Sequence, residues 1–407
     1  MTIKKLGIVT AFTAAMMMVL AAGAPARAQA PDDVRAVAKA SNAFAGRLYG
    51  ELAKEEGNLF FSPYSISSAL AMTYAGARGR TADQMAAVLG FSLTPDKLDP
   101  ALAALMAGFN AKGKPYELYV ANALWGQAGY PFALDFLGTI GKYFGGGFRE
   151  VDYRGETSRE KARQEINAWT EDHTAKKIKD LIKPNILTPL TRLVLTNAIY
   201  FKGNWARQFR AADTRPMPFT VSAARKVEVP MMRQKAEFGY LEDDGLQALE
   251  VRYAGDDLAM VVLLPESPAG LAAVEAALPR KLDGWLAGLS REKVEVFLPR
   301  FKLEQDFALN DPLAALGMED AFSEAAADFS GMRSDGAKDL YITKVVHKAF
   351  VDVNEEGTEA AAATAVVVGT KSIMMNPVFK ADHPFLFLIR DLRTGTVLFL
   401  GRMAEPK

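Results

Sequence analysis

The sequence predicts an α+β fold, because helical patterns concentrate in its first part and strand patterns in the remainder. Apolar residues recur at helical spacing at Val34, Val37 and Phe44. Strand-like segments dominate later, and the last two are joined by a short loop that contains Thr394-Gly395, a hairpin signal. Helices followed by strands are typical of α+β folds rather than of a doubly wound sheet.

Three further helices are expected before residue 180. Ser62-Pro63 opens one of them, because serine caps helix N-termini and proline fits the first helical position. Thr81 with Gln84, and Thr157 with Glu160, read as capping boxes that begin the other two. The last of these helices runs toward His173.

The strand-rich remainder is expected to contain seven strands, and no repeat or flexible linker divides it. The predicted strands are Tyr116–Trp125, Leu193–Phe201, Leu258–Leu264, Val294–Leu298, Tyr341–Val353, Phe385–Ile389 and Val397–Leu400. Nothing in the composition marks a boundary between domains, so residues 29–407 are predicted to form a single domain.

Composition excludes several classes of function. The chain of 407 residues carries 48 basic and 48 acidic residues, and this balance argues against a nucleic-acid binder. It contains no cysteine, which excludes disulfides, thiolate nucleophiles and cysteine-type metal sites. The three histidines lie far apart in sequence, so no local metal motif is present and no cofactor is implied.

The first 28 residues are predicted to be a signal peptide of a bacterial-type cell. Lys4 and Lys5 precede an apolar stretch from Leu6 to Ala22, and Ala26-Arg27-Ala28 supplies small residues at the spacing that signal peptidase reads. No later segment is apolar for long enough to cross a membrane. The mature protein is therefore expected to be secreted or periplasmic, with no membrane partner after processing.

Two predicted strands carry a polar residue on an otherwise apolar face. Asn197 interrupts the face of Leu193–Phe201, and His347 interrupts that of Tyr341–Val353. A buried amide or imidazole without a partner costs about 1–3 kcal/mol. The two side chains are therefore expected to bond to each other or to a nearby hydroxyl, which we favour over a catalytic role for His347.

The segment 354–372 combines two properties that a plain edge strand or linker does not explain. Alternate residues on one face are small or apolar, namely Thr358, Ala360, Ala362, Thr364, Val366 and Val368. The segment ends in the polar sequence Gly369-Thr370-Lys371-Ser372, which is typical of an exposed loop. A segment that is a loop in one state and a strand in another explains both properties.

At these residues the chain resembles the serpin family, and the resemblance covers nearly the whole mature sequence. Six motifs occur in the family's order: Asn58–Ile66, Thr196–Trp205, Leu298–Phe301, Ala327–Met332, Val346–Ala349 and Asp382–Phe387. The sequence Glu-Glu-Gly-Thr-Glu-Ala at 355–360 matches the family's hinge. The resemblance implies three β-sheets, eight or nine helices and an exposed reactive loop at about residues 355–378.

The resemblance also implies a suicide inhibitor of serine proteases rather than an enzyme, active as a monomer. Inhibitory members keep small residues where the loop inserts into the central sheet, and this chain has four alanines there. The implied hinge consists of Glu355, Glu356, Gly357, Thr358, Glu359, Ala360, Ala361, Ala362, Ala363 and Thr364. The implied partner is a serine protease held in a covalent complex.

The position of the reactive bond is inferred from spacing within the family. Fourteen residues beyond Gly357 lies Lys371, which places the bond between Lys371 and Ser372. A lysine there fits a trypsin-like pocket, whose buried acid pairs with Lys or Arg. The downstream side is about two residues longer than usual, so Ile373 or Met374 is the alternative, favouring elastase-like or chymotrypsin-like proteases.

Two further groups of residues follow from the resemblance. One group would lie where the central strands part: Ser62, Ser65, Asn197 and His347. The other would lie at the point of first insertion: Trp205, Arg300 and Glu355.

Two alternative functions remain. One is a non-inhibitory serpin that acts as a binding protein or chaperone, and the other is a penicillin-recognising hydrolase, for which Ser158 and Lys161 form a weak motif.

Overall fold

A computed structural model describes residues 31–109, 113–358 and 376–406. The predicted signal peptide, hinge residues 359–364 and the candidate reactive bonds at 371–374 lie outside these ranges. The helices are α1 (Asp32–Leu52), α2 (Pro63–Tyr74), α3 (Gly79–Leu89), α4 (Pro95–Phe109), α5 (Leu134–Tyr143), α6 (Glu156–His173), α7 (Leu271–Ala287) and α8 (Asn310–Ala315). None of the helices in the described ranges is long and apolar enough to cross a membrane.

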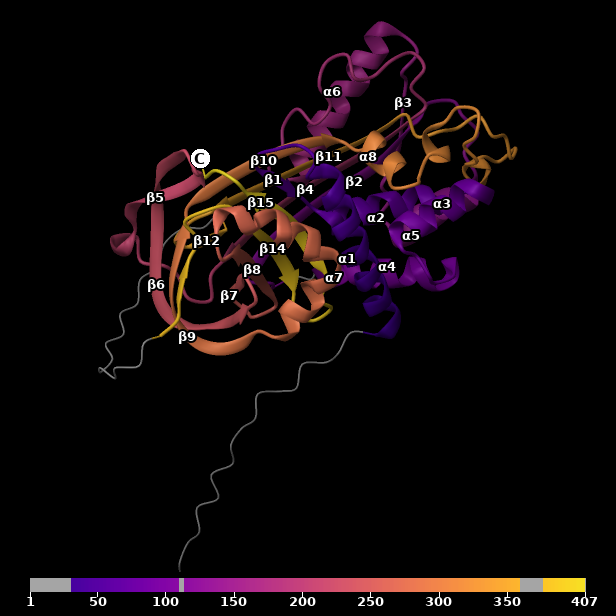
Figure 1. The fold of residues 1–407 in the computed structure, drawn as a ribbon. Helices are drawn as coiled ribbons and strands as arrows, with labels where there is room; N and C mark the ends of the chain where they lie inside the picture. Colours follow the sequence, from indigo (N-terminus) through magenta and orange to yellow (C-terminus); the bar gives the residue numbers. More distant parts are fainter. Residues whose placement is uncertain (1–30, 110–112, 359–375, 407) are drawn as a thin grey trace, which may run out of the picture.

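The strands alternate with these helices early in the chain and dominate its later part (Figure 1). They are β1 (Leu59–Phe61), β2 (Tyr116–Gln127), β3 (Phe148–Val151), β4 (Leu193–Asn204), β5 (Arg215–Ser222), β6 (Arg225–Asp243), β7 (Leu246–Arg252), β8 (Leu258–Pro265), β9 (Ser290–Pro299), β10 (Phe301–Ala308), β11 (Lys344–Val353), β12 (Gly357–Thr358), β13 (Val378–Lys380), β14 (Phe385–Asp391) and β15 (Val397–Met403). The predicted α+β class is confirmed.

The strands form two hydrogen-bonded networks. The first is a six-stranded sheet in the order β10-β11-β12-β4-β2-β3, and the second runs β1-β15-β14-β8-β7-β6-β9-β13 with β5 beside β6. The long strand β6 pairs with β9 along its middle and with β7 at its end. Two of the three expected sheets therefore form one continuous hydrogen-bonded network.

The six-stranded sheet is covered on both faces. Alternate residues of β2 and β4 point to opposite sides, because side chains alternate along a strand. Leu195 and Ile199 belong to the main core, which includes α2, whereas Val194 and Ala198 pack with Ala162 and Ile166 of α6 in a second cluster. Helix α6 and the segment after it thus cover one face of this sheet, and α2 covers the other.

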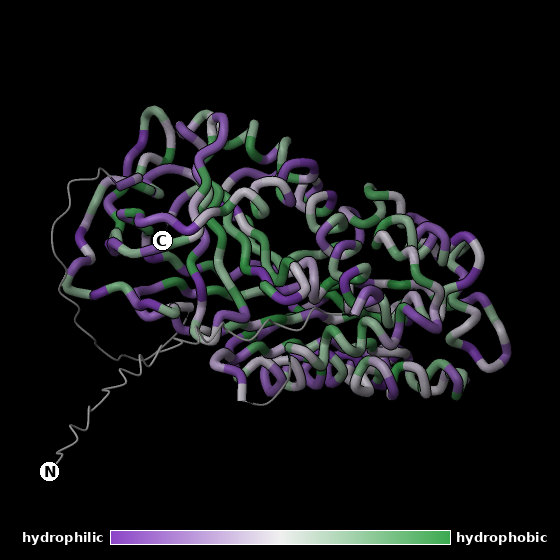
Figure 2. Tube along the Cα trace, turned by 90° about the horizontal axis from the view of Figure 1, so that it is seen from below, coloured by the Kyte–Doolittle hydropathy of each residue, from purple (hydrophilic) through white to green (hydrophobic). Residues whose placement is uncertain are grey.

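The second network supplies most of the remaining core. Strands β8, β14 and β15 are buried along almost their whole length. Figure 2 shows hydrophobic segments running through the interior of this part, with hydrophilic segments at its edges. As predicted, β14 and β15 form an antiparallel hairpin, and Gly395 in its turn adopts a left-handed φ of 77°.

Both predicted capping boxes are wrong. Helix α3 begins at Gly79, and Thr81 instead accepts a hydrogen bond from the backbone N–H of Asp328 at 2.9 Å. Helix α6 begins at Glu156, and no side chain caps it. Glu160 is instead paired with Arg163 in the next turn of the same helix.

Candidate functional site

The described part of the predicted hinge, residues 355–358, lies where two central strands part. Strands β4 and β11 run parallel and pair directly from Lys344↔Val194 to Phe350↔Tyr200. Beyond these residues they separate, and β12 lies between them. Thr358 pairs antiparallel with both Val353 of β11 and Gly203 of β4.

Two aromatic residues that directly follow β4 and β7 hold Thr358 in this position. Thr358 is fully buried, and its hydroxyl lies 2.8 Å from the hydroxyl of Tyr253. Burial strongly raises the pKa of the Tyr253 phenol, so it stays protonated and available for this hydrogen bond. The Tyr253 ring stacks on Trp205 at a centroid distance of 4.6 Å.

Gly357 must be a glycine for this arrangement. A Cβ atom at this position would lie 2.1 Å from the carbonyl oxygen of Gly203, which no real side chain tolerates. The close approach lets the backbone of β12 pair with the end of β4. The hinge is therefore fitted to the gap between the strands by its backbone as well as by its side chains.

The residues predicted for first insertion come together just before β12. The Trp205 indole N–H donates to the carbonyl oxygen of Asn354 at 2.9 Å. The carboxylate of Glu355 lies 3.5 Å from the guanidinium of Arg300 and accepts a hydrogen bond from the Thr214 hydroxyl at 2.7 Å. Three separate segments thus fasten the residues that precede the loop.

A buried polar cluster lies beneath the paired part of β4 and β11. It joins all four residues predicted for this region: Ser62, Ser65, Asn197 and His347. The Asn197 amide donates to the Ser65 hydroxyl at 2.5 Å and its oxygen contacts the His347 ring. The backbone N–H of Ser62 donates to His347 Nε2 at 3.1 Å, which ties α2 to the strands.

Comparison with known proteins identifies this architecture. The family model described as "Serpin (serine protease inhibitor)" matches residues 39–406. The chain belongs to the serpin family. An uncharacterized serpin-like protein of Thermococcus kodakarensis is 44% identical over 91% of this chain and 86% of its own length.

Two named relatives represent different activities within the serpin family. Human leukocyte elastase inhibitor is 42% identical over 91% of this chain and 99% of its own length. The crystal structure of human thyroxine-binding globulin with its ligand has a TM-score of 0.83, at 30% identity, covering 92% of this chain and all of that one. The family therefore includes inhibitors and at least one binding protein.

In this serpin the surroundings of His347 require a neutral imidazole. Since Nε2 accepts from the Ser62 N–H, the ring proton lies on Nδ1 and is donated to the Asn197 amide oxygen. Burial lowers the pKa of His347 to about 3. A second proton on Nε2 would face the Ser62 N–H donor, so protonation would break this link.

Three contact residues were missed in the sequence. Asn122 of β2 joins the polar cluster, where its oxygen accepts from the Ser65 hydroxyl at 3.2 Å. It interrupts an apolar face of β2 just as Asn197 interrupts β4, so the same signal was present. Tyr253 and Thr214, which hold the hinge, lie in segments without any local signal of that role.

Replacing His347 with Ala is expected to loosen the junction of β4 and β11. The change leaves the Ser62 N–H and the Asn197 amide oxygen without their buried partner, at about 1–3 kcal/mol each. A loosened junction accepts the loop of a second molecule more easily, so the variant should polymerise faster on mild heating. Native gels over time would measure this, with His173→Ala, an exposed histidine, as control. Monomers persisting at the wild-type rate would contradict the expectation.

Acid should have a related effect on the unmodified protein. Because the folded pKa of His347 is about 3 and the unfolded value is about 6.5, the unfolded chain takes up a proton that the folded chain excludes. This contribution to stability is fully present above pH 6.5 and is lost as the pH falls toward 3. Between pH 7 and pH 5 the loss is about 2 kcal/mol. Denaturant midpoints of wild type and His347→Ala should therefore converge at pH 5, whereas a constant gap would contradict the assignment.

Proposed function

We propose that this serpin is a suicide inhibitor of serine proteases, most of all trypsin-like ones. The protease serine attacks the Lys371 carbonyl, the amine of Ser372 leaves, and an acyl-enzyme forms on Lys371. The freed loop then inserts between β4 and β11 and carries the protease with it before water releases it. The serpin supplies no catalytic residue to this reaction.

One observation carries the proposal: the hinge already occupies the first position between the two strands. Thr358 pairs with both β4 and β11, so a chain continuing from it in extended form would run directly down their seam. Alternate residues after Thr358 are Ala360, Ala362 and Thr364, which are small enough to enter a packed sheet. Insertion then needs only the separation of residues 344–350 from 194–200.

The bait residue rests on sequence alone. Lys371 favours a trypsin-like target, and Ile373 or Met374 is the alternative bait for elastase-like or chymotrypsin-like targets. The human relative named for inhibiting leukocyte elastase supports protease inhibition, but its name refers to its own target.

A binding protein or chaperone without inhibitory activity is the alternative, since the family includes thyroxine-binding globulin. The small, uncharged residues after Thr358 favour the inhibitor over this alternative.

We also propose that a bacterial cell exports the chain, cleaves it after Ala28 and releases a monomer into the periplasm or the medium.

Incubation with trypsin is expected to give a covalent complex that survives boiling in detergent. The acyl bond to Lys371 forms, and insertion distorts the protease before deacylation. A gel of reactions with trypsin, chymotrypsin and elastase distinguishes the candidates. Cleavage of the loop with fully active protease remaining would favour the non-inhibitory alternative, and a complex with elastase alone would move the bait to Ile373 or Met374.

A further inference from the structure

Strands β6, β9 and β13 present an open sheet face beside the end of the reactive loop. Strand β9 lies between the other two and pairs with both. Side chains alternate along a strand, so residues that face each other in register share one side of the sheet. Ala236, Val294 and Phe379 lie on the buried side. The opposite side, which we call the β6–β9–β13 face, is turned toward solvent, and Val378 on it is 49% exposed.

This face carries more basic than acidic residues. Its five basic residues are Arg233, Lys235, Arg291, Lys293 and Lys380. Its two acidic residues are Glu237 and Glu295. The whole chain is balanced, with 48 basic and 48 acidic residues, so the face is a local concentration of positive charge.

Two of these cations are already paired. Arg233 forms an ion pair with Glu295, and Lys380 lies 2.9 Å from the carboxylate of Asp382. Glu237 is unpaired and offsets one further positive charge. Within the described ranges, the cations of this face that have no ion-pair or hydrogen-bond partner are Lys235, Arg291 and Lys293. An excess of two positive charges therefore remains for a partner molecule.

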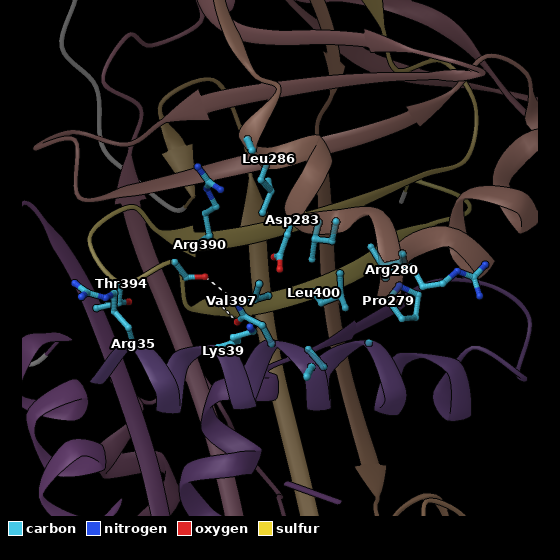
Figure 3. Close-up of a pocket in the computed structure, with 18 residues that line it drawn as sticks. Arg35, Lys39, Pro279, Arg280, Asp283, Leu286, Arg390, Thr394, Val397 and Leu400 are labelled. Carbon is cyan, nitrogen blue, oxygen red and sulfur yellow. Dashed lines mark hydrogen bonds between the residues drawn. The ribbon is translucent and has the colours of Figure 1, made fainter. Parts of the chain in front are cut away.

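A second group of basic residues lies elsewhere in the fold. Arg35, Lys39, Arg280 and Arg390 line a cleft of about 610 Å³ between α1, α7 and the β14–β15 hairpin (Figure 3). Because those cations line the walls of a hollow, they do not form the open surface that a protein partner needs. The β6–β9–β13 face does form such a surface.

The position of this face brings it within reach of a protease on the reactive loop. The backbone N–H of Glu295 donates to the carbonyl oxygen of Pro377 at 2.9 Å, so the chain enters β13 directly beside β9. Lys371 precedes Pro377 by six residues, which span at most about 22 Å when fully extended. A protease domain of about 200 residues is about 40 Å across. Its body therefore extends to this face on the side where the segment after the cut leaves.

We propose that the β6–β9–β13 face is a docking surface for the protease that cuts the loop, and that it favours proteases with an acidic surface on the leaving-group side. This inference rests on the proposed function, since it names a further property of the same target. Lys235, Arg291 and Lys293 attract the acidic surface during encounter. Charges at the rim of an interface act mainly on the rate of association and make it depend on salt.

Two trypsins of opposite net charge, the anionic and cationic isoforms, test the proposal on the full mature chain. Both accept lysine, so each rate is divided by the rate of the same trypsin on a short, neutral lysine peptide. Gels give the second-order rate constant for loss of intact serpin, whether it becomes cut or enters a covalent complex. The anionic isoform should consume the serpin about tenfold faster at low salt, and the difference should shrink as salt is added.

The double variant Lys235→Glu/Lys293→Glu should lower the preference for anionic trypsin by about tenfold. Lys97→Glu/Lys161→Glu is the matched control, because it makes the same change in net charge at exposed lysines of α4 and α6. The control should keep the wild-type preference. Equal normalised rates for the two trypsins would overturn the proposal. So would an unchanged preference in Lys235→Glu/Lys293→Glu, or an equal loss in the control, which would show that net charge alone acts.

The same gels separate docking from inhibition. The fraction of serpin that enters the covalent complex tests the proposed inhibitor, whereas the ratio of the two rates tests the face. Cut serpin without any complex, consumed faster by anionic trypsin, would contradict inhibition and support docking. Covalent complexes that form with the two trypsins at equal normalised rates would support inhibition and contradict docking.

Discussion

Cleavage of the loop at Lys371–Ser372 is expected to raise the melting temperature of this serpin by about 10 °C or more. The intact chain tethers the loop at both ends, by β12 at one side and β13 at the other. Cutting frees one end, and the residues after Thr358 can then continue β12 between β4 and β11. The cut protein would gain a full central strand.

The size of the effect follows from the pairing of these strands. Insertion breaks one parallel ladder, between residues 194–200 and 344–350, and forms two antiparallel ladders in its place. The net gain is about one ladder of hydrogen bonds, each contributing about 0.5–1.5 kcal/mol, and the antiparallel geometry is slightly better. Burial of Val366 and Val368 adds about 1.5–3 kcal/mol each. The sum is comparable with the whole stability of a typical domain, about 5–15 kcal/mol.

The measurement needs no physiological target. A catalytic amount of a non-target protease cuts the loop, a gel confirms two fragments, and gel filtration shows that they stay associated. Melting curves of the cut and intact proteins are then compared. An equal or lower melting temperature after cleavage would show that the segment does not insert, and the proposed trapping mechanism would fall with it.

Sequence patterns predicted strands best where one face is continuously apolar. Strands β4, β8, β14 and β15 are largely buried, and their apolar runs were visible in the sequence. Strand β6 was missed, although Ala236, Phe238 and Tyr240 alternate on its buried side. Charged residues dominate its other face, and Pro230 lies opposite Pro216 on the paired edge of β5. These features conceal the period of two that reveals a strand.

The contacts of the candidate site were predicted in two ways. An imidazole and an amide on apolar strand faces needed partners, which predicted the contact between Asn197 and His347. The resemblance to the serpins supplied the rest, namely Ser62, Ser65, Trp205, Arg300 and Glu355. The contact of Tyr253 with Thr358 had no such signal, because the sequence around a tyrosine does not by itself show whether its side chain is exposed or buried. It depends on how the two strand networks meet, through the bridge between Trp205 and Tyr253.

Replacing Thr358 with Arg is expected to convert the inhibitor into a substrate. Thr358 is fully buried between β4 and β11 and bonded to Tyr253, so an arginine there has no partner for its charge. An unpaired buried charge costs several kcal/mol. The hinge would leave the sheet and insertion would slow, whereas acylation at Lys371 would proceed unchanged. Deacylation would then win, and trypsin would release a cleaved serpin.

Glu359→Arg provides the matched control, because residue 359 falls on the opposite face of an extended chain from Thr358. It introduces the same side chain one residue later and should keep the stoichiometry of inhibition near the wild-type value. Thr358→Val measures the contribution of the hydroxyl alone. It keeps the shape of the side chain and loses only the hydroxyl contact with Tyr253. Titration of trypsin with each variant measures moles of serpin used per mole of protease inhibited. The ratio of cleaved to complexed serpin, which follows from this titration, should rise about tenfold or more for Thr358→Arg, as expected when insertion is slowed by about 1.4 kcal/mol or more. A wild-type ratio in Thr358→Arg would mean that the chain beyond β12 does not enter the sheet through this gap.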